Sequence, residues 1–326
     1  MSLTVYDANY EKRLSEYFDR FMPQKIYDAH FHISKSYAES TNYPGDPYQQ
    51  YAEFMEKYIG RKIAGGLIMA MPSSKHTPAQ LDEENAYILD LAKREGLEVG
   101  LLMMPSYTRE RAENMLALHP QIKALKPYLT YTTGKDMFES DIFDFAPAWM
   151  WELANDRELP VILHLSHYQN MLWDENNIRD LRYISEKYPK AKIVLAHCAM
   201  GHHVEKLRWG LDAISDLKNI WLDCSGAAEA LSIYYCIKTF GVGRMVYGDD
   251  FTHGATPGRI VSFGANFFGF HPAFVTNTEL VPDYRYQPMD NARECLLALI
   301  EACELLSLSD ADREAIFYAN AKALYK

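Results

Sequence analysis

The stretch Lys25-Ile26-Tyr27-Asp28-Ala29-His30-Phe31-His32 is the first of several short apolar runs, and it contains two histidines one residue apart. Side chains alternate across a β-strand, so residues two apart lie on the same face. If this run is a strand, the imidazoles of His30 and His32 point the same way and can bind one metal ion. A chain with 11 histidines in 326 residues contains such a pair easily by chance. The pair therefore indicates a metal site only if the other strands contribute further ligands.

Seven further apolar runs follow, and helix-like stretches separate them. None is longer than eight residues, which is typical of buried parallel strands; with the first, they are 26–32, 64–71, 98–105, 122–129, 160–166, 192–199, 220–225 and 244–250. Eight strands alternating with helices predict an α/β fold of the (β/α)₈ TIM-barrel type. A doubly wound sheet is the alternative, but Ala29-His30-Phe31-His32 is not the glycine-rich loop expected after its first strand.

Two segments lie outside this repeat. Residues 1–24 are expected to form an N-terminal helical extension, because 4–23 has its apolar residues on one side of a helix. This helix is expected to cap the barrel or to pack on a partner subunit, which makes a homodimer plausible. Residues 25–326 are expected to form one barrel domain. Within it, the glycine-, proline- and aromatic-rich stretch 251–290 is expected to be a lid-like insertion.

The composition of the chain limits the kinds of partner that it is expected to bind. The net charge of −11 and the pI near 5.5 oppose binding to nucleic acid or to an anionic membrane. No window reaches the roughly 18 apolar residues of a membrane helix, and no secretory signal is visible. The five cysteines are odd in number and form no Cys-x-x-Cys pair, as in a reducing compartment. We therefore expect a cytoplasmic protein that acts on a small molecule.

Chemically active side chains recur at the ends of the predicted strands. In a TIM barrel these carboxyl ends form the active site. The side chains are His30 and His32 in the first strand, Lys126 in the fourth, His164 in the fifth, His197 in the sixth, and Asp249 and Asp250 in the eighth. Imidazole and carboxylate suit a divalent ion such as Zn²⁺. The barrel would bring these distant segments together.

The order Asp28-x-His30-x-His32, His164, His197 and Asp249 resembles the amidohydrolase superfamily. The closing stretch Ile316-Phe317-Tyr318-Ala319-Asn320-Ala321-Lys322-Ala323-Leu324 resembles the final helix of its amidohydrolase-related branch, which includes aminocarboxymuconate-semialdehyde decarboxylase. The resemblance implies that His30, His32, His164 and Asp249 bind one divalent metal ion, with zinc favoured over manganese or iron. It also implies that His197 acts on a metal-activated water as base or orienting group, and that Asp249 shuttles its proton. A catalytic zinc ion lowers the pKa of its water to about 7.

The role of Lys126 stays open between two alternatives that the resemblance implies. In members with two metal ions, a lysine on the fourth strand is carboxylated and bridges the ions. In members with one ion, a basic residue there contacts an anionic substrate. We favour one metal ion, and we expect Lys126 and His253 to bind substrate.

These features predict a metal-dependent hydrolase of a small, carboxylated organic substrate. The same branch includes non-oxidative decarboxylases and hydratases, which form the alternative. A deoxyribonuclease resembling the TatD group is disfavoured by Lys126, where those proteins carry an acidic residue, and by the negative net charge. A non-catalytic barrel with a structural metal is disfavoured because structural zinc sites are closed by four protein ligands, usually including cysteines.

Overall fold

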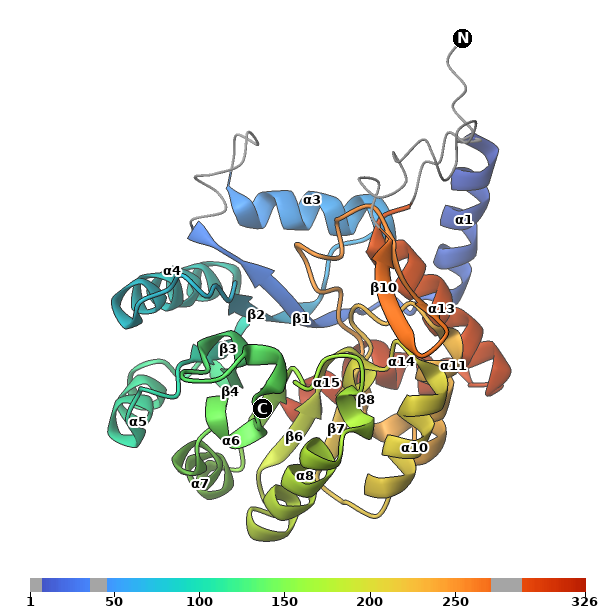
Figure 1. Ribbon diagram of the computed structural model, residues 1–326. Helices are drawn as coiled ribbons and strands as arrows, with labels where there is room; N and C mark the ends of the chain where they lie inside the picture. Colours follow the sequence, from blue (N-terminus) through green and yellow to red (C-terminus); the bar gives the residue numbers. More distant parts are fainter. Residues whose placement is uncertain (1–7, 36–45, 271–288) are drawn as a thin grey trace, which may run out of the picture.

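The computed structural model describes residues 8–35, 46–270 and 289–326. Eight parallel strands form one sheet in sequence order, and helices alternate with them (Figure 1). The strands are β1 (Tyr27–Ile33), β2 (Gly65–Ala70), β3 (Glu98–Met103), β4 (Ile122–Pro127), β5 (Pro160–Leu163), β6 (Lys192–Leu195), β7 (Ile220–Asp223) and β8 (Met245–Val246). The predicted (β/α)₈ barrel is confirmed.

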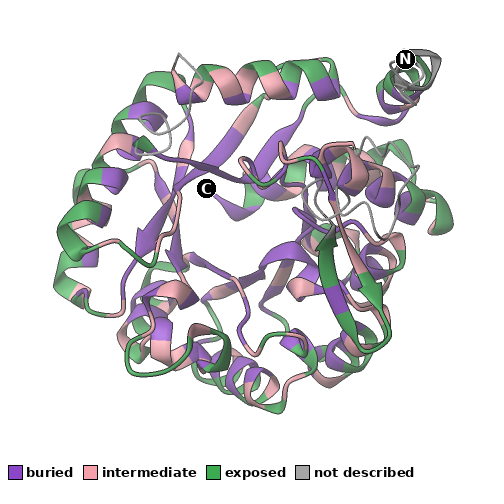
Figure 2. Cartoon of the chain, turned by 45° about the horizontal axis from the view of Figure 1, so that its top comes forward, coloured by how far each residue is buried: buried purple, intermediate pink, exposed green. Residues whose placement is uncertain are grey.

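The helices surround the strands, with buried residues on their inner sides and exposed residues outward (Figure 2). The longer ones are α3 (Pro47–Ile59), α4 (Pro78–Glu95), α5 (Arg109–Leu118), α7 (Ala148–Arg157), α8 (Glu175–Lys187), α10 (Val204–Ile214), α11 (Ala230–Phe240) and α13 (Asn291–Leu305). The shorter ones are α6 (Ile142–Phe145), α9 (Ala196–Met200), α14 (Asp310–Glu314), α15 (Asn320–Leu324), η1 (Leu129–Tyr131), η2 (Met137–Glu139), η3 (Met171–Trp173), η4 (Val242–Arg244) and η5 (Ala315–Ala319). Helix α4 shows the local logic: Thr77 caps its start in a capping box, and Gly96 ends it with φ of 70°.

The barrel closes through the segment that follows β8. That strand is only two residues long, and the chain beyond it continues alongside β1. The amide of Asp250 donates to the carbonyl of His30 at 2.7 Å, and the amide of His32 donates to the carbonyl of Phe251 at 2.6 Å. The closure therefore places the histidine pair next to the acidic end of the eighth apolar run.

A β-bulge in β1 decides which side chains face the interior. Asp28 pairs with Gly66, but Phe31 pairs with Ile68, so β1 has one extra residue between these points. Such an insertion reverses the alternation of side chains beyond it. Tyr27 belongs to the apolar cluster that fills the barrel with the C-terminal residues Leu324 and Tyr325, whereas Phe31 packs in the layer between strands and helices. The bulge therefore turns the histidines of this strand inward.

Helix α1 (Ala8–Phe21) packs on its own chain. Leu14, Phe18 and Phe21 are buried in the main apolar cluster, and Asp19 forms an ion pair with Arg61 at 2.7 Å. The apolar face of this helix therefore packs at least in part on the barrel of its own chain. The homodimer stays a prediction.

The predicted lid segment is described at residues 251–270 and 289–290. It forms a hairpin of β9 (Arg259–Phe263) and β10 (Asn266–Phe270), whose strands pair antiparallel; residues 271–288 of the predicted lid lie outside the described residues. All five cysteines are buried and unpaired, as expected. Among the helices described, none combines the length and apolar character that a membrane crossing requires.

Candidate metal centre

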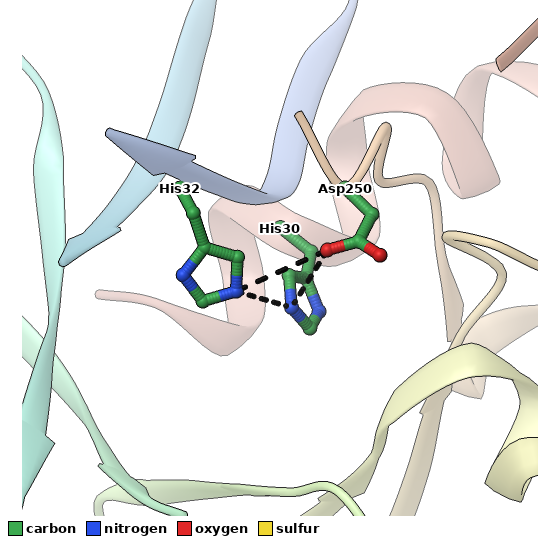
Figure 3. A group of neighbouring side chains, drawn as sticks. All are labelled: His30, His32 and Asp250. Atoms are coloured by element: carbon green, nitrogen blue, oxygen red, sulfur yellow. Dashed lines mark hydrogen bonds and ion pairs between the residues drawn. The ribbon is translucent and has the colours of Figure 1, made fainter. Parts of the chain in front are cut away.

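Three side chains converge on one point where the barrel closes (Figure 3): His30 and His32 from β1, and Asp250 from the segment after β8. His30 Nε2 lies 3.2 Å from His32 Nε2. The Oδ1 atom of Asp250 lies 3.8 Å from His30 Nε2 and 3.9 Å from His32 Nε2. A circle through three atoms with these separations has a radius of about 2.1 Å, the length of a Zn–N or Zn–O bond. The spacing of the three atoms therefore fits a transition-metal ion.

The other nitrogen of each imidazole supports this interpretation. His30 Nδ1 lies 2.9 Å from a carboxylate oxygen of Asp223, and His32 Nδ1 lies 2.8 Å from the carbonyl oxygen of Ala70. Both partners are acceptors, so both rings carry their proton on Nδ1 and present a lone pair on Nε2. Two lone pairs that face each other at 3.2 Å repel unless a cation lies between them. The donor set thus fits a bound metal ion.

His164 and His197 extend this cluster in the same pattern. The ring of His197 lies 5.0 Å from that of His30 and 5.3 Å from that of His164, centroid to centroid. Each holds its Nδ1 against a backbone carbonyl, Leu165 at 3.1 Å and Ser225 at 2.9 Å respectively. Fixing Nδ1 in this way leaves Nε2 as the free, basic nitrogen of each ring.

A left-handed turn positions His197. The four residues His197, Cys198, Ala199 and Met200 have φ between 51° and 58°, and none of them is glycine. This conformation costs roughly 1–2 kcal/mol for each L-residue, so surrounding contacts must hold it. The amide of His197 donates to Asp223 at 3.1 Å, and the side chains of Cys198 and Ala199 are buried. Strain of this kind collects at functional sites.

The acidic residue of the cluster is Asp250, whereas the sequence analysis expected Asp249. The carboxylate of Asp249 is buried next to Gly254, and neither of its oxygens has a hydrogen-bond partner among the described residues. Burial first, and then the charges of Asp28 and Asp250, raise the pKa of Asp249 well above its usual value. Asp250 rather than Asp249 lies at the histidine pair for a local reason. Its φ is 60°, so the alternation of side chains along the strand does not extend to it.

Asp28 ties the two halves of the site together. One of its oxygens accepts from the amide of His30 at 3.1 Å and from the amide of Asp249 at 3.0 Å. The other oxygen accepts from the hydroxyl of Tyr51 in α3 at 2.7 Å. These bonds fix the backbones of β1 and of the segment after β8 at the level of the metal centre.

The histidines of the centre are in the form that binds metals. Burial, aided by the charge of Lys126, lowers the pKa of His30, and burial lowers the pKa of His164 to about 3. Burial also lowers the pKa values of His32 and His197 well below their usual range. Neutral imidazoles at pH 7 are ready to ligate a cation without first losing a proton.

A cavity of about 430 Å³ opens above the centre. Its described wall includes His32, His164, His197 and Asp250 from the centre, with Met71, Pro72, Tyr128, Met200, His202, Gly226, Thr252, His253, Thr256 and Ile260 around them. Ile260 belongs to β9, so the hairpin contributes to the wall. The size suits a small organic molecule.

The two residues expected to bind substrate lie in different places. His253 is exposed and forms part of the cavity wall. Lys126 is fully buried beneath the centre, and its ammonium has no hydrogen-bond partner within the described part of the chain. Its charge acts on the four histidines, since it contributes to lowering the pKa of each.

Sequence reasoning missed Asp223, which orients His30 and accepts from the amide of His197. The available signal was an acidic residue at the end of the seventh apolar run.

The protein-family model described as amidohydrolase matches residues 27–326 of the chain. The chain belongs to the amidohydrolase family. This match confirms the resemblance drawn from the histidines and the closing helix. No curated protein matches this amidohydrolase in sequence.

Solved structures similar to this amidohydrolase share its fold. One is an amidohydrolase 2 from Bifidobacterium longum subsp. infantis, with 14% identity, a TM-score of 0.54, and coverage of 92% of this chain and 98% of that chain. Another is 2,6-dihydroxybenzoate decarboxylase from Rhizobium, with 12% identity, a TM-score of 0.57, and coverage of 93% and 99%. A third is a probable 2-pyrone-4,6-dicarboxylic acid hydrolase from Acinetobacter baumannii, with 14% identity, a TM-score of 0.55, and coverage of 93% and 99%. Hydrolases and decarboxylases thus share this architecture.

Proposed function

We propose that this amidohydrolase is a metal-dependent hydrolase of a small, carboxylated organic substrate. The observation that carries the proposal is the approach of His30 Nε2, His32 Nε2 and Asp250 Oδ1 to one another at the base of the cavity. We assign these residues and His164 as ligands of one divalent ion, with zinc favoured and manganese or iron as alternatives. Such an ion, when bound, polarises a carbonyl oxygen and lowers the pKa of an adjacent water.

The chain's own residues supply the proton transfers. Asp250 is the one acidic side chain in the described cavity wall. Its Oδ1 atom lies at the histidine pair, whereas its Oδ2 atom lies 4.0 Å from Nδ1 of His197, so this second oxygen stays available to take up and release a proton. Asp250 accepts a proton from the attacking water while the oxygen atom of that water bonds to the substrate carbon. It returns that proton to the oxygen or nitrogen of the bond that breaks.

Three other residues orient the reactants in this scheme. His197, held at Nδ1 by Ser225, directs Nε2 at the water. While it is protonated, the buried ammonium of Lys126 attracts the carboxylate of the substrate toward the centre. His253 lies in the cavity wall, where it can contact the bound substrate.

Non-oxidative decarboxylation or hydration at the same centre is the second candidate. The buried ammonium of Lys126 also favours a substrate whose reacting group is itself a carboxylate, as decarboxylation requires. A solved structure with this fold is a decarboxylase of 2,6-dihydroxybenzoate.

Product analysis separates the two candidates. The metal-loaded enzyme is incubated with 2-pyrone-4,6-dicarboxylate, with 2,6-dihydroxybenzoate, and with esters and amides of aromatic acids. Chromatography detects hydrolysis products, and headspace analysis detects carbon dioxide. Hydrolysis without carbon dioxide is expected, with loss of activity on chelation and recovery when metal is restored. Carbon dioxide release would support the second candidate, and turnover that survives complete metal removal would refute both.

A further inference from the structure

His202 is a buried polar residue of the cavity that the chemistry above does not use. Its side chain forms part of the cavity wall, and the residue is only 3% exposed. Neither ring nitrogen has a hydrogen-bond partner among residues 8–35, 46–270 and 289–326. A neutral imidazole offers one N–H and one lone pair to a molecule in the cavity. These features point to a ligand that completes the hydrogen bonding of this ring.

The hairpin holds His202 in this position. The ring of Phe267 in β10 packs against that of His202, with 4.9 Å between centroids. The backbone of Phe267 is in turn clamped by Gln169, whose Oε1 accepts from the amide at 2.8 Å and whose Nε2 donates to the carbonyl at 3.2 Å. His203 Nε2 donates to the carbonyl of Gly264 at 2.8 Å, which fastens the turn of the hairpin. These contacts hold the ring of His202 at the cavity wall.

Besides the histidines of the metal centre, the described cavity wall around His202 contains one carboxyl group, that of Asp250, and one further imidazole, that of His253. Burial, and then the charge of His253, lower the pKa of His202 to about 4, so its ring is neutral at pH 7. The cavity wall, as far as it is described, contains no arginine or lysine, and much of it is apolar: Met71, Pro72, Met200 and Ile260. An apolar body suits such walls. A neutral hydroxyl or carbonyl group of the substrate needs no counter-charge at a neutral imidazole.

We propose that His202 determines specificity by hydrogen-bonding a hydroxyl or carbonyl group on the carboxylated substrate. This inference rests on the proposed function, which places the carboxylate of the substrate at the metal centre. The neutral imidazole can donate to a carbonyl, and it can both donate to and accept from a hydroxyl. The substrate class is therefore a carboxylate with an apolar body that carries an uncharged polar substituent.

Binding of matched probes tests the proposal. Isothermal titration calorimetry measures the affinities of benzoate, 3-hydroxybenzoate, 4-hydroxybenzoate and benzene-1,3-dicarboxylate for the metal-loaded wild type and three variants. His202→Phe removes the hydrogen bonds, His202→Gln keeps a donor and an acceptor, and His119→Phe is a control at the end of α5, away from the cavity. The wild type and the control are expected to bind one hydroxybenzoate roughly tenfold more tightly than benzoate. His202→Phe should bind benzoate as the wild type does and lose the preference, and His202→Gln should retain part of it.

Several outcomes would overturn the proposal. If His202→Phe keeps the preference, or weakens benzoate and hydroxybenzoate equally, the residue only supports the wall. Tighter binding of the dicarboxylate than of both hydroxybenzoates would refute the uncharged substituent. If no probe binds the metal-loaded wild type, the substrate class is wrong. Metal content is measured on the same samples: a wild type without metal refutes the proposed function, whereas loss of the preference with metal retained concerns His202 alone.

Discussion

Replacement of Lys126 by methionine tests whether a buried positive charge lies beneath the metal centre. The lysine is fully buried, and its ammonium has no hydrogen-bond partner in the described part of the chain. Burial lowers its pKa from 10.5 to about 8, although the charges of Asp223 and Asp250 oppose the shift. Methionine keeps much of the volume and removes the charge. The experiment uses the metal-free protein, because a bound cation would lower this pKa further.

The size and the pH dependence of the effect follow from this shift. One pKa unit corresponds to about 1.4 kcal/mol, so the lowered pKa destabilises the folded protein at pH 7 by about 3 kcal/mol. A lysine with a lowered pKa loses its proton in the folded state first. Its penalty is therefore complete below pH 8 and declines as the pH rises from 8 to 10.5. Lys126→Met should raise the free energy of unfolding by about 3 kcal/mol at pH 7, and by only about 1 kcal/mol at pH 9.5.

Urea unfolding of chelator-treated protein at both pH values measures this difference. Lys123→Met is the matched control, since Lys123 is a partly exposed lysine of the same strand. That control should change stability by less than about 0.5 kcal/mol at either pH. The reasoning fails if Lys126→Met destabilises the protein at pH 7, or if its effect is the same at pH 7 and pH 9.5.

Two further substitutions test the frame of the centre. Tyr51→Phe removes the hydrogen bond to Asp28 and leaves a buried carboxylate oxygen without this donor. Thermal and urea unfolding should show that the free energy of unfolding falls by about 2 kcal/mol. A change near zero would count against the role of Asp28. Gly248→Ala places a Cβ 2.8 Å from the Cβ of His30, so it should weaken metal binding at least several-fold in a chelator competition, whereas Gly243→Ala, which meets nothing within 4 Å, should not. Equal affinities in these two variants would contradict the packing described.

The barrel and most residues of the candidate metal centre could be predicted from local patterns. Buried parallel strands appear as short apolar runs between amphipathic helices, and the barrel topology then places every run's carboxyl end at one face. That argument needs no contact information. It brought His30, His32, His164 and His197 to one site from three separate runs, and the structure places their rings within one cluster.

The choice between Asp249 and Asp250 could not be made in this way. Alternation identifies the inward residue only while the chain stays in strand geometry, and β8 ends at Val246. Beyond that point Asp250 adopts a positive φ, which no sequence pattern announces for an aspartate in a loop. The bulge in β1 is a similar case, because it changes which residues face the interior without any glycine or proline to mark it.

The supporting contacts were also beyond sequence reasoning. Asp223 holds His30 from a position 193 residues away, and only the closed barrel makes them neighbours. His202 looks like an ordinary residue before a helix. Its place in the cavity wall follows from the left-handed turn at His197 and from the packing of Phe267. Both features are tertiary, and they lie where the loops define the site.

The most direct test of the metal centre compares two neighbouring aspartates. Asp249→Asn and Asp250→Asn are purified with the wild type, their folds are checked by circular dichroism, and metal per chain is measured by elemental analysis. The wild type and Asp249→Asn should hold about one divalent ion per chain, and Asp250→Asn should hold little or none, because of these two carboxylates it is that of Asp250 that lies at the Nε2 atoms of the histidine pair. Full metal in Asp250→Asn together with loss in Asp249→Asn would contradict the assignment. Two ions per chain in the wild type would favour a carboxylated Lys126 as a bridge.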